Sequence, residues 1–310
     1  AIDYFTRALA LVQPDDLRTK FDLMLLRVEC YYNNSDSAAQ FIDLDILEEL
    51  AKTLQDDGLL GRAYMRRSYC FSALGDFQNV LTYATRAKFF AEAALDNETL
   101  LSTYLVLPNS FLRIGKAEEA LKYAKEGLRY AQGQNDRTGI GKALSILGLV
   151  SLEIETPTIA MGYQEQALVI ARELKNKYLE AMTLNNLANT VGLSQGDFFT
   201  ARNYFEQAYS ISHELGNLNG NGIALLNLGW LTGMLGDYPA ATSYYEQALT
   251  ILRGLGLRAQ EMLAYINLSA VMGAQGDADN SLKWARQALE LASRNGDPSG
   301  EGWAYFYLGY

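Results

Sequence analysis

The decisive stretch of this sequence runs from residue 223 to residue 252 and reads IALLNLGWLTGMLGDYPAATSYYEQALTIL. Apolar residues recur at i, i+3, i+4 and i+7 on both sides of Gly236-Asp237, which is the pattern of two amphipathic helices. Glycine can end the first helix in a left-handed backbone conformation, and aspartate can cap the second by accepting a backbone N–H. The stretch therefore predicts two helices joined by a tight turn, and no alternating strand pattern competes with it.

The same turn recurs with a period of about 40 residues, starting at positions 35, 75, 115, 155, 196, 236 and 276. At the irregular turn, Thr156 can cap the next helix and Pro157 can take its first position. A fixed period of this length indicates repeated helix pairs. We expect half repeats at 1–12 and 298–310, with full repeats at 17–54, 58–95, 98–133, 138–175, 178–215, 218–255 and 258–295. Pro108 should remove one backbone hydrogen bond inside its helix.

Small and aromatic residues form columns when the repeats are aligned on the turn. Seven residues before the turn glycine lie Gly148, Gly229 and Ser269, where a small side chain lets two helices approach closely. A tyrosine column lies eight residues after the turn start, and we interpret its rings as packing between helices. Its members are Tyr83, Tyr123, Tyr163, Tyr204 and Tyr244, with Trp284 in the last complete repeat.

The chain resembles the tetratricopeptide repeat family in one pattern above all, which consists of Leu225-x2-Leu228-Gly229, Gly236-Asp237-Tyr238, Ala241, Tyr245 and Ala248. The period is longer than the usual one of about 34 residues, as in the mitotic scaffold LGN and in bacterial signalling proteins. The resemblance implies an all-α fold, a right-handed α-solenoid of stacked antiparallel helix pairs that spans residues 1–310 as a single unit. Because the chain begins and stops inside a repeat, we expect it to be a fragment of a larger multidomain protein.

Composition argues against several functions. The net charge of −10 disfavours direct binding of nucleic acid, and no apolar stretch is long enough to suggest a membrane partner. One histidine and two cysteines make a metal site improbable on composition alone. No phosphate-binding loop, dinucleotide fingerprint or nucleophile elbow occurs. We therefore expect no catalytic residue, no metal and no cofactor, in a cytoplasmic protein that is not an enzyme.

In the family, the first helix of each pair lines a concave groove. The resemblance places Asn186, Asn227 and Asn267 at one groove position, where an amide that both donates and accepts can pair with a peptide backbone. In the alternative interpretation these asparagines bond one another or helix termini along the stack. The remaining candidates for peptide binding are Asn189, Leu226, Trp230, Met234 and Ile266. Trp230 can equally be a core residue.

The N-terminal part of the groove is expected to be more basic. Its candidates for contacts with an anion or a carboxylate are Arg62, Arg66, Arg113, Lys142, Tyr69 and Asn109. The alternative is that the arginines are solvated or paired internally.

These patterns predict a non-catalytic scaffold for protein–protein interaction. It would bind a peptide or helix in its concave groove, or dock a neighbouring domain. The alternative is a ligand-responsive sensor region, a peptide receptor, of a bacterial signalling ATPase, cyclase or transcription regulator. The aromatic C-terminal helix suggests self-association.

Overall fold

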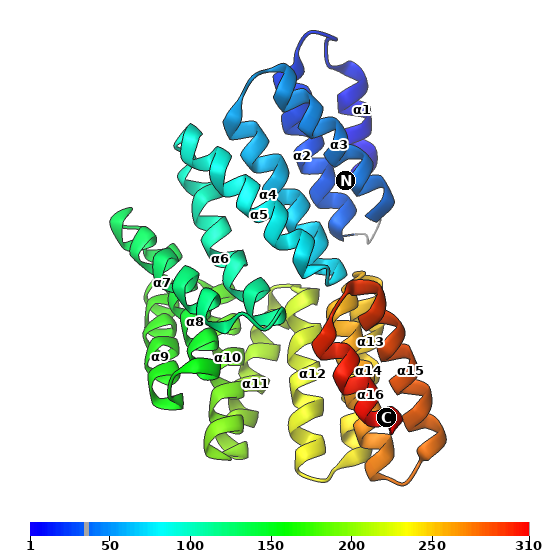
Figure 1. Cartoon of the computed structure of the whole chain (residues 1–310). Coiled ribbons are helices and arrows are strands. Elements are labelled where there is room, and N and C mark those ends of the chain that lie inside the picture. The colour runs from blue at the N-terminus through cyan, green and yellow to red at the C-terminus, as the bar shows by residue number, and fades with distance from the viewer. Residues whose placement is uncertain (34–36, 310) are drawn as a thin grey trace.

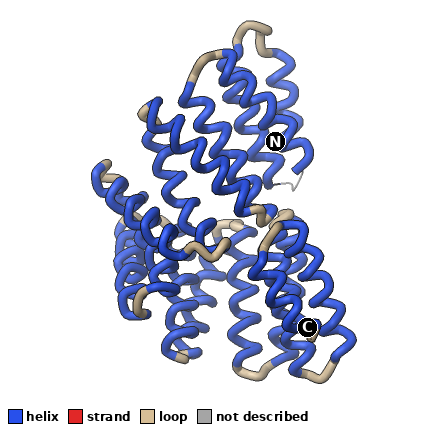
Figure 2. Tube along the Cα trace, viewed as in Figure 1, coloured by secondary structure: helices blue, strands red, loops and turns tan. Residues whose placement is uncertain are grey.

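The computed structural model describes residues 1–33 and 37–309, which form sixteen helices and no strand (Figures 1 and 2). The turn expected at Ser35 lies outside these residues. The helices are α1 (Ile2–Leu11), α2 (Leu17–Asn33), α3 (Ser37–Thr53), α4 (Asp57–Leu74), α5 (Phe77–Ala94), α6 (Asn97–Arg113), α7 (Ala117–Gly133), α8 (Arg137–Ile154), α9 (Pro157–Glu173), α10 (Lys177–Gln195), α11 (Phe198–Glu214), α12 (Leu218–Met234), α13 (Tyr238–Gly254), α14 (Arg258–Ala274), α15 (Ala278–Asn295) and α16 (Pro298–Leu308). The expected all-α solenoid of stacked helix pairs is confirmed.

The turns within each pair have the predicted chemistry. The turn glycines adopt positive φ angles between 65° and 84°, and they are Gly75, Gly115, Gly196, Gly236 and Gly276. Asp237 caps α13 by accepting the backbone N–H of Ala240. At the irregular turn, Thr156 accepts the N–H of Ile159 and Pro157 opens α9. Pro108 lies inside a continuous α6.

The connections between pairs lie where the expected repeats end, and they form a second series of left-handed turns whose conformation the sequence pattern did not predict. Their left-handed residues are Gln55, Leu95, Asn135 and Lys175, with φ between 52° and 54°, and then Gly216, Gly256 and Gly296, with φ between 61° and 64°. The first four turns lack the glycine that would have revealed them.

Aromatic rings of the tyrosine column stack against the first helix of the pair, as the column predicts. Tyr83 stacks on Phe71 with ring centroids 5.4 Å apart, and Trp284 stacks on Tyr265 at the same separation.

The solenoid curves until the repeat of α4 and α5 meets the repeat of α14 and α15 (Figure 1). The turn between α4 and α5 lies against α14 and the end of α15, and a Cβ on Gly75 would lie 2.8 Å from Nδ2 of Asn295. Phe77, Val80 and Ala259 form a small apolar cluster at this contact. The described helices include none with the length and apolar character needed to span a membrane.

Candidate functional site

The first helices of the last repeats enclose an apolar cavity of about 440 Å³. Trp230 and Met234 line it from α12, Ile266 and Asn267 from α14, and Trp303 from α16. Ile266 is buried, whereas the side chains of Met234 and Trp303 are 60% and 54% exposed. The cavity therefore has a buried floor and an exposed apolar rim, and it brings together four residues that the sequence singled out.

The cavity has uncharged walls throughout its described lining, which includes no Asp, Glu, Lys, Arg or His. Burying an unpaired charge in such a place is costly. The cavity is therefore suited to a neutral group with apolar or aromatic surface.

A second, smaller cavity of about 180 Å³ lies between α10 and α12 and is rich in amides. Asn186 Nδ2 donates to Ser145 Oγ at 3.0 Å, and Asn227 Nδ2 donates to Asn185 Oδ1 at 2.9 Å. These bonds join successive first helices along the stack. Each uses one of the two amide hydrogens, so the amides keep capacity for a further partner.

Asn219 also lines this second cavity, and its Oδ1 atom is buried without a hydrogen-bond partner among the described residues. An unpaired buried acceptor costs free energy that a ligand N–H can recover. The sequence pattern missed Asn219 because it lies in the first turn of α12, away from the asparagine column.

The remaining C-terminal candidates are more deeply placed. Leu226 is buried in the apolar cluster of α12 to α15. Trp230 packs partly against the cluster around Phe205, so one part of its ring serves the core while the residue also lines the cavity. Asn189 is half-buried and lines neither cavity.

A third cavity of about 290 Å³ lies in the N-terminal groove and contains Arg62, Arg66 and Tyr69. Arg62 Nε lies 2.9 Å from Asp96 Oδ2, and Arg66 lies 3.2 Å from Glu29. Burial opposes the ionised form of Asp96, but the hydrogen bonds from Arg62 and Thr99 together outweigh it and lower the pKa of Asp96. Both arginines are thus paired internally, with partners more than thirty positions away in the sequence.

The other basic candidates lie apart from this cavity. Arg113 lies beside the contact of the α4–α5 repeat with α14, and its guanidinium lies 5.6 Å from the ring centroid of Phe77. Burial lowers the pKa of Arg113, and the nearby Asp297 carboxylate partly offsets this effect. Lys142 and Asn109 line none of the three cavities.

Comparison with known proteins agrees with this architecture. Residues 179–254 match the sequence model of the tetratricopeptide repeat family. This segment therefore consists of tetratricopeptide repeats. A search of curated proteins finds no match to this repeat protein.

Among solved structures, the repeat protein is similar to the Rap conjugation gene regulator of the plasmid pLS20 in complex with the Phr* peptide. That match has a TM-score of 0.69 and 14% identity, and it covers 91% of this chain and 76% of the other. A Rap protein complexed with competence and sporulation factor has a TM-score of 0.67 and 15% identity, with 96% and 87% covered. The STAND protein PH0952 from Pyrococcus horikoshii, which has a tetratricopeptide repeat sensor, has a TM-score of 0.55 and 16% identity, with 99% and 47% covered. At these identities the similarity shows a shared fold.

Proposed function

We propose that this protein is a non-catalytic interaction module that binds a peptide along the first helices of its C-terminal repeats. The observation that carries this proposal is the apolar cavity between α12, α14 and α16, whose rim exposes Met234 and Trp303. Apolar and aromatic side chains at the centre of a concave surface are typical anchors for a partner.

The amide-rich cavity beside it supports a peptide as the ligand. Asn185, Asn186 and Asn219 present both N–H and C=O groups there. Such groups can pair with a peptide backbone whatever its side chains. The two similar Rap structures are complexes with a peptide or a sporulation factor, which supports the same type of ligand for this groove.

Binding to a peptide library tests the proposal. A variant with Asn186→Ala, Asn227→Ala and Asn267→Ala should bind selected peptides about tenfold more weakly, since two or three hydrogen bonds of about 0.5–1.5 kcal/mol each are lost.

Ser145→Ala is the matched control, because it removes the partner of Asn186 and leaves the amide in place. It should bind like the wild type if the asparagines act on the ligand. Equal affinity of the triple variant and the wild type for every peptide would contradict the proposal.

The contact between the repeat of α4 and α5 and the repeat of α14 and α15 favours a sensor as the second candidate function. Gly75 and Phe77 lie against α14 and α15 there, so a change in superhelix pitch would open or tighten this contact. Small-angle scattering with a selected peptide should show a changed radius of gyration, and an unchanged radius would favour a static scaffold. The molar mass from the same data tests self-association through α16, where Trp303 and Phe306 are exposed.

A further inference from the structure

One wall of the apolar cavity is a tyrosine from a second helix. Tyr245 lies on α13, and its side chain is only 2% exposed, yet it lines the cavity between the first helices. Gly229 on α12 makes this possible, because a Cβ there would lie 2.7 Å from Cε1 of the Tyr245 ring. The glycine lets the ring pass beside α12 and reach the concave side.

The hydroxyl of Tyr245 forms no hydrogen bond with any residue in the described part of the chain. Burial raises the pKa of Tyr245, and the nearby Tyr307, which also lines the cavity, adds to the effect. The hydroxyl therefore stays protonated at neutral pH and can both donate and accept. Because it has no partner within the protein, it is available to a group that enters the cavity.

Packing alone does not require this hydroxyl. Nine positions after the turn start, the preceding repeat has Phe205, which is fully buried without a polar atom. One repeat earlier, Gln164 occupies the same position, and its Oε1 accepts a hydrogen bond from Thr190 at 2.9 Å. The Nε2 atom of Gln164 is buried without a partner, but neither Gln164 nor Phe205 lines any of the three cavities, whereas Tyr245 does.

We propose that this cavity takes a tyrosine side chain of the bound peptide, whose phenol pairs with the hydroxyl of Tyr245. The inference rests on the proposed peptide-binding function. Trp230 and Trp303 provide aromatic surface for the ring, and the uncharged lining excludes Lys, Arg, Asp and Glu as the inserted residue. The volume of about 440 Å³ lies within the range of small-ligand pockets.

Three small probes of nearly equal shape test this inference on the whole chain, namely p-cresol, p-xylene and 4-methylbenzoate. Calorimetry or ligand-observed NMR should show p-cresol binding about threefold to tenfold more tightly than p-xylene, since one neutral hydrogen bond is added. The anionic 4-methylbenzoate should bind at least tenfold more weakly than p-cresol. Equal binding of p-cresol and p-xylene, tighter binding of 4-methylbenzoate, or failure of p-cresol to bind would overturn the inference.

Variants locate the effect. Tyr245→Phe keeps the ring, as Phe205 does in the preceding repeat, and should remove the preference for p-cresol while leaving p-xylene binding within twofold. Tyr244→Phe is the control, because this neighbouring tyrosine does not line the cavity, and it should keep the preference. Ala270→Phe, which fills the cavity, should abolish binding of both neutral probes. If Tyr245→Phe still binds p-cresol more tightly than p-xylene, the inference is wrong. The asparagine variants test the proposed peptide binding independently of this result.

Discussion

The N-terminal repeats from α2 to α5 and the C-terminal repeats from α12 to α15 each stack around an apolar cluster, but the N-terminal helices are joined by more charged pairs. In the first region charged residues are paired between helices, as in the bond from Arg27 Nε to Asp43 Oδ2 at 2.7 Å. In the second region the centre is an apolar cluster that includes Tyr245, Leu249 and Leu268. The repeat pattern thus determines the path of the chain and leaves open which forces join neighbouring helices.

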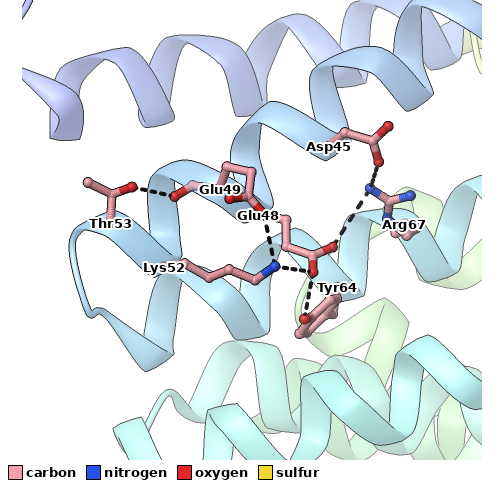
Figure 3. Close-up of polar contacts among 7 residues, drawn as sticks. All are labelled: Asp45, Glu48, Glu49, Lys52, Thr53, Tyr64 and Arg67. Carbon is pink, nitrogen blue, oxygen red and sulfur yellow. Dashed lines mark hydrogen bonds and ion pairs between the residues drawn. The ribbon is translucent and has the colours of Figure 1, made fainter.

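The polar contacts of the N-terminal region meet around Glu48 and Arg67 (Figure 3). Glu48 accepts a hydrogen bond from the hydroxyl of Tyr64 at 3.0 Å and pairs with Lys52 at 2.9 Å. Arg67 is 8% exposed, pairs with Asp45 at 2.5 Å, and lies within 6 Å of two aromatic ring centroids. Arg67 lies eight residues before Gly75, where the C-terminal repeat has Leu228 eight residues before Gly236, so a cation acts here through its charge and its aliphatic stem.

The largest effect is expected in the C-terminal region. Tyr245→Ala should destabilise α12 to α14 by about 3–5 kcal/mol, because it opens a cavity beside Gly229. Hydrogen exchange should show the loss in these helices and much less in α2 to α5, since solenoid repeats contact only their neighbours. Tyr244→Ala, at a half-buried position, should cost much less; equal losses would mean that Tyr245 is not the centre of this core.

Arg67→Ala should have the next largest effect, about 2 kcal/mol on α3 to α5. It leaves Glu48 partly buried without one of its cations and removes the packing between the rings of Phe41 and Tyr83. Asp45 is largely exposed, so its loss of a partner adds little. Arg67→Met keeps the stem and should recover part of the loss in urea unfolding; a loss equal to that of Arg67→Ala would mean that the charge alone matters.

Acid should lower the stability of the N-terminal region before that of the C-terminal region. The loss should be smaller than that caused by Arg67→Ala. Burial opposes the ionised form of Glu48, but hydrogen bonds from Lys52 and Tyr64 outweigh it and lower the pKa. A carboxyl with a lowered pKa in the folded state stabilises above its unfolded value, near 4.5, and this stabilisation is lost as the pH falls through the folded pKa. Hydrogen exchange below pH 4.5 should therefore increase in α3 and α4 before α12 to α14.

Glu48→Gln is the control for this pH dependence. Because the amide does not titrate in this range, the variant should be less stable at pH 7 and lose less protection on acidification than the wild type. An unchanged acid profile would place the pH dependence on other carboxyl groups, such as Asp96, whose pKa is also lowered.

Local chemistry explains which features the sequence could predict. Gly236 and Asp237 determine their turn through their own backbone and side chain, so the turns within pairs and the helix order were predictable. The pairing of Arg62 with Asp96 depends on how α4 stacks beside the start of α6, and the contact of Gly75 with Asn295 depends on curvature accumulated over several helices. No local pattern encodes either contact.

The candidate site likewise contains residues that the sequence could place and one that it could not. Trp230, Met234, Ile266 and Asn267 could be placed together because they recur on one face of successive first helices. Tyr245 entered the sequence analysis only as part of the repeat pattern, since only first helices were expected to line the groove. The pairing of Gly229 with a large residue at 245 was the available signal.

The smallest effect concerns the turns between pairs, which also differ between the two regions. Leu95 adopts a left-handed conformation with φ 54° and is 82% exposed, whereas Gly216 takes the equivalent place with φ 64°. Leu95→Gly should stabilise the folded protein by about 0.5 kcal/mol. Relief of the strained φ contributes slightly more free energy than the substitution costs through the added entropy of the unfolded chain. Gly216→Ala should destabilise by about 1 kcal/mol for the converse reason. Thermal unfolding measures both effects. If both substitutions destabilise the protein, the packing of the Leu95 side chain outweighs the strain of its backbone. The N-terminal turns would then depend on side-chain contacts, whereas the C-terminal turns depend on the conformational freedom of glycine.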